Sequence, residues 1–171
     1  MSATILGSAE RGYEAVAEAF AKAFDGRPAM GAALHIVRDG HTVVDLWGGV
    51  ADARTGRLWG QYTPSVVFSC TKGLVSILAA RLVQEGRLDY TVPVSQYWPE
   101  FAAAGKAAVT VGQALAHQAG LSAPRADLSE DDIVDWERVT AALAAQEPLW
   151  PLGTGYAYHA LTHGWLAGEL I

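Results

Sequence analysis

The chain has 171 residues, of which 51% are hydrophobic and 18% are charged. This length suits one domain with a hydrophobic core, and the composition differs from the charge-rich make-up of disordered chains. The formal net charge of -6, from 18 acidic and 12 basic residues, provides no cationic surface for phosphate backbones or anionic lipid. We therefore expect no nucleic-acid partner and no membrane partner.

The cysteine content and the N-terminal residues predict a cytoplasmic protein. Cys70 is the single cysteine of the sequence, so it cannot form an internal disulfide, and we expect a buried structural thiol. The start MSATILGSAERGYEA lacks the basic region and the long apolar region of a signal peptide. The apolar runs are shorter than the roughly 20 residues that a membrane-spanning helix needs.

The first 60 residues predict a helix followed by a β-hairpin. Apolar side chains recur with three- and four-residue spacing from Ala9 to Phe24, which is typical of an amphipathic helix. Residues 31–52 then form two β-rich runs on either side of Asp39-Gly40, a dipeptide that accepts the positive φ values of a tight turn. We therefore expect an antiparallel hairpin there.

Residues 61–171 are predicted to be mainly helical. Helical spacing or boundary signals mark four segments: Gly73 to Glu85, 110–120, Glu130 to Gln146, and Tyr158 to the end. The first of them puts Ser69 at or near a helix N-terminus. The acidic run Ser129–Asp132 is typical of an N-cap and first turn before the third.

The last predicted helix and the single hairpin indicate an incomplete fold. No C-cap glycine follows the helix that starts at Tyr158, and two strands alone make a marginal sheet. We therefore expect the chain to be the N-terminal part of a longer or split protein. A second polypeptide segment or chain would then complete the sheet.

The stretch VVFSCTKG places Ser69 and Lys72 three residues apart at the start of a helix. Side chains at this spacing share a helical face, and a helix N-terminus supplies free N–H groups that favour a serine alkoxide and a developing oxyanion. A lysine that acts as a base must be desolvated, which apolar neighbours such as Phe68 and Leu74 would provide. The pattern indicates either an activated nucleophile or an ordinary polar helix start.

A second segment, PLGTGYAYHALTHGW, favours the catalytic interpretation. Its glycine-rich turn delivers Tyr156 and Tyr158 to the start of an apolar stretch. A lysine ammonium nearby can lower the pKa of a tyrosine phenol, and the phenolate is then a suitable general base. Core packing is the alternative role for a tyrosine in this place.

The order of these segments resembles a known family. VVFSCTKG, then VTVGQALAHQAGL, then GTGYAYHALTHGW is similar to the serine β-lactamase-like superfamily, and within it to the family VIII carboxylesterases, which look like class C β-lactamases in fold. The sequence GAALHIVRDGHTVVDLWGGVADARTG also looks like that group. The resemblance implies an α/β (α+β) fold, here incomplete. Residues 1–60 would give a helix and a hairpin of the antiparallel sheet region, and residues 61–171 the helical region packed beside it.

The resemblance also implies a catalytic group. Ser69 would be the acylated nucleophile, Lys72 its helper, and Tyr158 the base and proton shuttle. Tyr158 is preferred to the tyrosine two residues earlier because the family's tyrosine lies four residues after the threonine of a Gly-Thr turn, here Thr154. His117 is expected near this group but outside it.

Two departures from the family pattern bear on function. The β-lactamase pattern has an asparagine two residues after the tyrosine, where this chain has Ala160, whose side chain offers no donor or acceptor. This change favours esters over lactams. The family's third motif, a strand that supplies the second oxyanion donor, has no counterpart after Tyr158, so the sequence contains half of an oxyanion hole.

Other candidate residues lie beside the predicted catalytic group. Trp150, Tyr156 and His159 are the expected substrate contacts. His159 and His163 lie at i and i+4, as in helical zinc sites, but Ala160 replaces the glutamate that the zinc motif requires. We therefore expect no metal and no cofactor.

Together these features predict a serine hydrolase that cleaves small-molecule carboxylic esters through an acyl-enzyme on Ser69. β-Lactamase, D-peptidase or acyltransferase activity of the same superfamily is the alternative within the enzyme class. A non-catalytic truncated or split fragment that serves in assembly or ligand binding is the alternative outside it.

Overall fold

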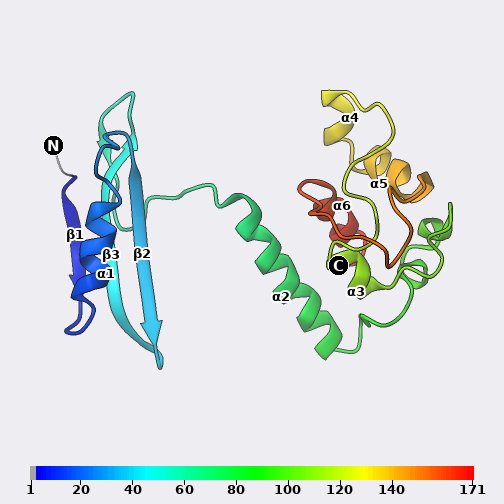
Figure 1. The fold of residues 1–171 in the computed structure, drawn as a ribbon, viewed down its shortest axis with the longest axis horizontal. Coiled ribbons are helices and arrows are strands. Elements are labelled where there is room, and N and C mark those ends of the chain that lie inside the picture. Colours follow the sequence, from blue (N-terminus) through cyan, green and yellow to red (C-terminus); the bar gives the residue numbers. More distant parts are fainter. Residues whose placement is uncertain (1–2) are drawn as a thin grey trace. The chain divides into compact units, whose positions relative to one another are not determined.

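The computed structural model describes residues 3–171, which divide into two compact units (Figure 1). One unit runs up to Val66, and the other spans Val67–Ile171. The predicted division of the family fold into residues 1–60 and 61–171 stays a prediction.

The first unit contains a four-stranded antiparallel sheet in which the long strand β3 is central. Its strands are β1 (Ile5–Ala9), β2 (Gly31–Arg38), β3 (His41–Asp52) and β4 (Arg57–Leu58). The order is β1-β3-β2, and β4 pairs with the end of β3. The hairpin prediction is confirmed: β2 and β3 pair directly, and Asp39 and Gly40 have φ values of 52° and 78°, both positive as a two-residue hairpin turn prefers.

Helix α1 (Glu14–Lys22) packs on one face of this sheet (Figure 1). Val16, Ala17 and Phe20 contact a small core that includes Val44 and Leu46 of β3. The helix starts later than the spacing from Ala9 predicts, because β1 takes up Ala9 and residues 11–12 form a turn. The apolar face of α1 is therefore shorter than expected, but it still covers one face of the sheet.

The sequence reasoning missed strand β1. Its sequence ILGSA is short and shows no clear alternation, so the strand is defined by pairing with residues about forty positions away in β3. Gly7 is required there, since a Cβ atom at this position would lie 2.0 Å from the carbonyl oxygen of Asp45. The sheet is therefore larger than the two strands expected from the sequence.

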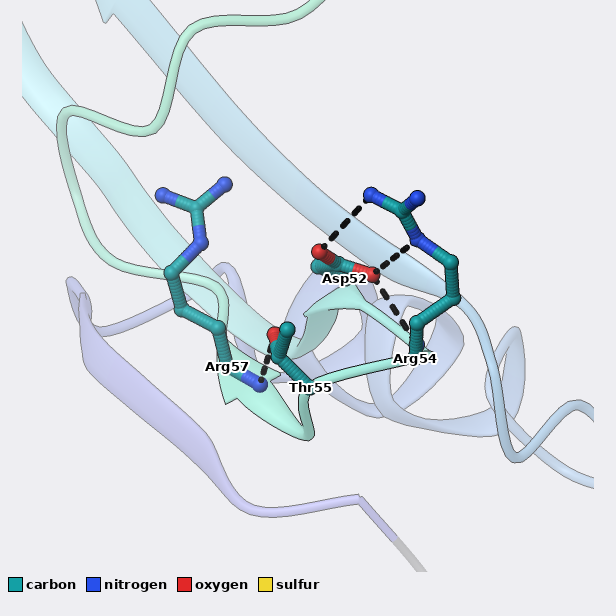
Figure 2. Close-up of polar contacts among 4 residues, drawn as sticks. All are labelled: Asp52, Arg54, Thr55 and Arg57. Atoms are coloured by element: carbon teal, nitrogen blue, oxygen red, sulfur yellow. Dashed lines mark hydrogen bonds and ion pairs between the residues drawn. The ribbon is translucent and has the colours of Figure 1, made fainter.

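Polar side chains stabilise the turn between β3 and β4, as Figure 2 shows. The Asp52 carboxylate accepts a hydrogen bond from the backbone N–H of Arg54 at 2.9 Å and two longer ones from its guanidinium at 3.4 Å. Thr55 Oγ1 accepts from the backbone N–H of Arg57 at 3.4 Å. The bond from the Arg54 N–H to the Asp52 carboxylate is an Asx turn, in which an aspartate side chain accepts from the backbone two residues later.

The second unit is mainly helical, as predicted. Its helices are α2 (Thr71–Gln84), α3 (Val111–Leu115), α4 (Glu130–Val134), α5 (Trp136–Ala145) and α6 (Thr162–Gly168). Its core gathers side chains from all of these except α4, and the largest fully buried apolar members are Phe101, Leu121, Leu143 and Leu166. Among the described residues, no helix is both long and apolar enough to cross a membrane.

Two helix predictions need correction. The helix expected from Glu130 to Gln146 is broken at Asp135, whose ψ of 104° is extended, so that α4 and α5 are separate. The Asp135 side chain accepts from the Arg138 N–H at 3.1 Å, which caps α5. The predicted N-cap and acidic first turn at Ser129–Asp132 are confirmed, and Ser129 and Asp132 form a capping box. The last helix begins at Thr162 rather than Tyr158 and ends at Gly168.

Lys106 is a fully buried cation at the end of α5. Its Nζ donates to the carbonyls of Ala103 at 2.8 Å and Ala144 at 2.9 Å, and also to the carbonyl of Gln146. These acceptors include carbonyls at a helix C-terminus, where the helix dipole favours positive charge. Burial lowers the pKa of Lys106.

Helix α2 exposes much of its apolar surface. Leu74, Ile77 and Leu78 are exposed by 60%, 65% and 52%, and Ala79 is the one α2 residue that is buried in the described chain. These three apolar side chains lie on one helix and are not covered by the other elements of the second unit.

Candidate active site

Ser69 lies in a 3-10 turn, Phe68–Cys70, that leads directly into α2. Phe68 has φ of 45°, a left-handed conformation that is unusual for a residue with a large side chain. Such conformations cost on the order of 1–3 kcal/mol and occur where the surrounding structure demands them. The prediction that Ser69 lies at a helix N-terminus is confirmed, and the first N–H groups of α2 lie beside it.

Lys72 is one turn along α2 from Ser69. Its Nζ donates a hydrogen bond to Ser69 Oγ at 3.1 Å and another to the carbonyl oxygen of Ala160 at 2.8 Å. The first contact is the i, i+3 neighbour relation that the sequence predicts. The second joins α2 to the segment before α6, and the sequence reasoning missed it because a backbone carbonyl carries no residue-type signal.

Tyr158 reaches the same place from the segment that precedes α6. Its ring centroid lies 5.0 Å from Lys72 Nζ. Hydrogen bonding with Ser69, and then with Lys72, holds the pKa of the Tyr158 phenol below its ordinary value. The structure therefore brings together Ser69, Lys72 and Tyr158, as the sequence analysis expected.

A cavity of about 290 Å³ lies beside the Ser69 and Lys72 side chains. It is lined by Phe68, Ser69, Thr71, Lys72, Val75, Ala160, Leu161, His163 and Gly164. Ala160 and Leu161 also line a second, largely apolar cavity of about 360 Å³, together with Trp165 and loop residues near Pro124. A small substrate at Ser69 would therefore meet walls from α2, from the 160–161 segment and from α6.

The three predicted substrate contacts have different surroundings. Tyr156 is 65% exposed and free to contact a ligand. Trp150 packs against Gly155, and its indole N–H has no hydrogen-bond partner among the described residues. His159 is fully buried: its Nε2 accepts from the Leu121 N–H at 3.0 Å, and its Nδ1 lies 2.6 Å from the Ala157 carbonyl. The role of His159 as a substrate contact stays a prediction, and both of its ring nitrogens are bonded inside the protein.

Two further histidines approach the site. His117 stacks near Tyr158 with 5.0 Å between ring centroids, and its pKa is lowered to about 4, first by burial and then by His163, His159 and Lys72. His163 lines the cavity beside Ser69, is buried, and has its pKa lowered, mainly by burial. Within residues 3–171, no group of three or more side chains is arranged to hold a metal ion.

The neighbours of Ser69 correct two expectations. Cys70, in the 3-10 turn before α2, is exposed rather than buried. Phe68 and Leu74, which were expected to desolvate Lys72, are 81% and 60% exposed. Lys72 Nζ contacts its two hydrogen-bond acceptors and the Tyr158 ring. Phe68 and Val75 line the same cavity as Lys72.

Comparison with known proteins identifies the family. The profile of the Beta-lactamase family matches residues 17–171. The chain is 42% identical over 166 residues to "Esterase/beta-lactamase LipL" of Mycobacterium tuberculosis, covering 97% of this chain and 38% of that protein. Among solved structures, a family VIII carboxylesterase has a TM-score of 0.90 and 43% identity. A penicillin-binding protein homolog from Caulobacter crescentus has a TM-score of 0.89 and 44% identity, and both matches cover 98% of this chain and 45% of the other.

The chain belongs to the Beta-lactamase family, a group of esterase and β-lactamase-like hydrolases. The predicted resemblance to family VIII carboxylesterases and the predicted β-lactamase-like fold are confirmed. The chain spans 38% of its curated relative and 45% of the two solved structures. A cytoplasmic location stays a prediction.

Proposed function

We propose that this chain carries the nucleophilic group of a serine hydrolase that cleaves carboxylic esters. The observation that supports it most strongly is the contact between Lys72 Nζ and Ser69 Oγ at 3.1 Å, with Tyr158 beside both. A serine needs a neighbouring proton acceptor to become a nucleophile. The esterase and carboxylesterase names of its relatives agree with this chemistry.

The contacts suggest different roles for Lys72 and Tyr158, the two partners of Ser69. Lys72 Nζ donates to two acceptors, Ser69 Oγ and the Ala160 carbonyl, so we assign it the role of hydrogen-bond donor. Tyr158, with its lowered phenol pKa, is then the group that accepts a proton. This assignment makes Lys72 the helper and Tyr158 the base.

In the proposed acylation step, Ser69 Oγ forms a bond to the ester carbonyl carbon while its proton passes to the Tyr158 phenolate. The tetrahedral intermediate collapses, the bond to the alcohol oxygen breaks, and Tyr158 returns the proton to that oxygen. Water then attacks the acyl-enzyme with Tyr158 again as the base, which releases the acid and restores Ser69. The Ser69 N–H at the helix start would donate to the oxyanion.

Esters are favoured over lactams by the residue at position 160. Ala160 has no side-chain donor or acceptor for a substrate amide, and its carbonyl is occupied by Lys72. β-Lactamase, D-peptidase and acyltransferase activities remain candidates of the same superfamily, because one relative is named both esterase and β-lactamase and another is a penicillin-binding protein homolog. Parallel assays with a p-nitrophenyl ester and a chromogenic cephalosporin would rank them.

A fluorophosphonate probe followed by mass spectrometry tests the nucleophile. We expect labelling of the chain on the peptide that contains Ser69, and loss of labelling in Ser69→Ala. Ser76→Ala is a matched control, because Ser76 lies on the same helix and its hydroxyl donates to the Lys72 carbonyl rather than to the site. Labelling that persists in Ser69→Ala, or that disappears in Ser76→Ala, would contradict the proposal.

We also propose that a second polypeptide segment or chain completes the sheet. The match to less than half the length of the relatives supports this. A non-catalytic fragment that serves in assembly is the alternative to an active chain. Light scattering gives the mass of the 171-residue chain in solution, and an ester assay gives its turnover. A non-catalytic fragment predicts no turnover from the chain alone, whereas an active chain predicts measurable turnover.

A further inference from the structure

His117 lies at the centre of the aromatic groups that surround the proposed catalytic tyrosine. It follows α3 and has a left-handed backbone with φ of 63°. Its ring centroid is 5.0 Å from that of Tyr158, 5.0 Å from His163, 5.3 Å from His159 and 6.1 Å from Tyr156. The function proposed above assigns no role to this histidine.

A hydrogen bond connects His117 to the backbone beside Tyr158. The N–H of His159 donates to His117 Nδ1 at 3.1 Å. This N–H belongs to the peptide unit that joins Tyr158 to His159, so the bond restrains the backbone on the C-terminal side of the tyrosine. An Nδ1 that accepts must carry a lone pair, which requires the tautomer with hydrogen on Nε2.

Other bonds in the same segment hold the chain close to this point. The Ala160 N–H donates to the Tyr158 carbonyl at 3.1 Å, and the Ala160 carbonyl accepts from Lys72 at 2.8 Å. Residues 151–161 contain no helix or strand, so a regular ladder of hydrogen bonds does not hold Tyr158. Its position therefore depends on a few individual bonds to other parts of the chain. Lys72 of α2 donates to Ala160, and the Leu121 N–H donates to His159 Nε2 at 3.0 Å. The bond to His117 is the one made by the backbone directly beside Tyr158.

The charge state of His117 suits the role of an acceptor. The titratable groups that face it are Lys72 from α2, His163 from α6, and Tyr156, Tyr158 and His159 from the intervening segment. The pKa of His117 is about 4, so the ring is neutral and its Nδ1 lone pair is available over the neutral pH range.

We propose that His117 is a positioning residue that holds Tyr158 within hydrogen-bonding reach of Ser69 and Lys72. The inference rests on the proposed function, in which Tyr158 moves the proton of Ser69. Without the acceptor, the His159 N–H loses its partner and the segment around Tyr158 moves. The phenol then separates from Ser69 and Lys72, so kcat falls while KM changes little.

Two substitutions separate the acceptor from the ring. His117→Asn keeps an acceptor oxygen close to the position of Nδ1 and tolerates a positive φ, but it removes the ring. His117→Phe keeps a ring of similar width but removes the acceptor. Gln118→Ala, at the exposed neighbouring position, is the control that should behave as the wild type.

The readout is the titration of Tyr158, followed by NMR of ¹³Cζ-labelled tyrosine and assigned by comparison with Tyr158→Phe. The phenol pKa should return toward its ordinary value in His117→Phe and stay lowered in His117→Asn. On an ester substrate, kcat should fall by roughly tenfold to a hundredfold in His117→Phe, a part of what a general base contributes. An unchanged Tyr158 titration in His117→Phe would overturn the inference, as would a larger effect in His117→Asn.

One measurement needs no substitution and so does not depend on whether a variant folds. Long-range ¹⁵N–¹H correlation of the wild-type chain reports the tautomer of His117. Hydrogen on Nε2 is expected, and hydrogen on Nδ1 would overturn the inference, because that nitrogen could not then accept. If no variant or wild-type chain hydrolyses esters but the Tyr158 titration responds as described, the positioning role stands and the proposed function fails.

Discussion

Lys72 binds two acceptors that come from distant parts of the sequence. Ser69 Oγ is three residues away, whereas the Ala160 carbonyl is 88 residues away. A single ammonium thus both contacts the proposed nucleophile and secures the segment that carries Tyr158. Lys72 therefore has two effects: it holds the segment at Ala160, and it lowers the pKa of Tyr158. The pH dependence of activity should reveal the effect on Tyr158.

Replacing Lys72 by methionine should shift the pH dependence of ester hydrolysis. Lys72 lowers the pKa of the Tyr158 phenol by hydrogen bonding and by its charge. Activity that depends on the phenolate rises as pH increases through this pKa, so Lys72→Met should move the rise in kcat/KM to higher pH. The rate at neutral pH should fall by about a hundredfold or more.

A pH–rate profile with a p-nitrophenyl ester measures this shift. Lys22→Met, a change of the same kind at an exposed position in α1, should leave the profile unaltered. A Lys72→Met profile that falls in height without moving along the pH axis would argue against Tyr158 as the base.

At the scale of elements, loops in the second unit are shaped by a few special positions. Gly120 has φ of 72°, and a Cβ atom there would lie 2.8 Å from Pro148 Cβ and 3.1 Å from the Trp150 carbonyl. Gly153 has a similar φ of 78° but open space around it. Alanine would be strained by the positive φ at both positions, but it would also be crowded by neighbouring atoms only at Gly120.

Gly120→Ala should destabilise the protein more than Gly153→Ala. The left-handed backbone alone costs alanine about 1–2 kcal/mol, and crowding at Gly120 adds about 1–3 kcal/mol. Urea unfolding followed by tryptophan fluorescence measures both changes. Equal losses of stability in the two variants would show that the contact with Pro148 relaxes without cost.

Lys106 should contribute to stability through the end of α5. Lys106→Met keeps most of the side-chain volume but leaves the carbonyls of Ala103, Ala144 and Gln146 without their donor. Unpaired buried acceptors cost about 1–3 kcal/mol each before the structure relaxes. We expect a loss of about 2–4 kcal/mol in urea unfolding, with Lys22→Met as an unaffected control.

The elements could be predicted where their signals are local. The hairpin follows from Asp39-Gly40, and the start of α2 from the apolar spacing after Ser69. Strand β1 could not be predicted, because its pairing with β3 is long-range. The break at Asp135 was missed because its capping bond to Arg138 competes with continued helix, and sequence spacing alone does not decide that competition.

At the scale of the whole molecule, the candidate site joins three separate stretches: the start of α2, the end of α3 and the segment before α6. Motif order pointed to Ser69, Lys72 and Tyr158, and the structure brings these together. The contacts of His117 and the burial of His159 could not be predicted, because both depend on how α3 packs beside α6. Residue types indicate chemistry, whereas burial decides which of them a substrate can reach.

Three histidines with lowered pKa values predict that stability falls in acid. The pKa values of His117, His159 and His163 are all lowered from 6.5, mainly by burial. The unfolded chain therefore binds more protons below about pH 6.5, so the free energy of unfolding decreases as pH falls from there toward about 4. The urea midpoint should be lower at about pH 5 than at about pH 7.

His163→Phe should reduce this pH dependence, since it removes one buried titratable ring and keeps an aromatic side chain. Gln118→Ala, a substitution at an exposed position that involves no titratable group, is the control that should retain the wild-type dependence on pH. A urea midpoint that stays constant between these pH values would mean that the three rings titrate in the folded protein as they do in the unfolded chain.

The left-handed conformation of Phe68 has a consequence for engineering. A glycine at this position would adopt φ of 45° without strain, so Phe68→Gly is the kind of change that a screen for thermal resistance would select. The same change would let the backbone at position 68 adopt other φ values. The position of the Ser69 hydroxyl would then be less well defined. Phe68→Gly should therefore raise thermal stability and lower the rate of ester hydrolysis. Such a trade-off between stability and activity is common at active sites.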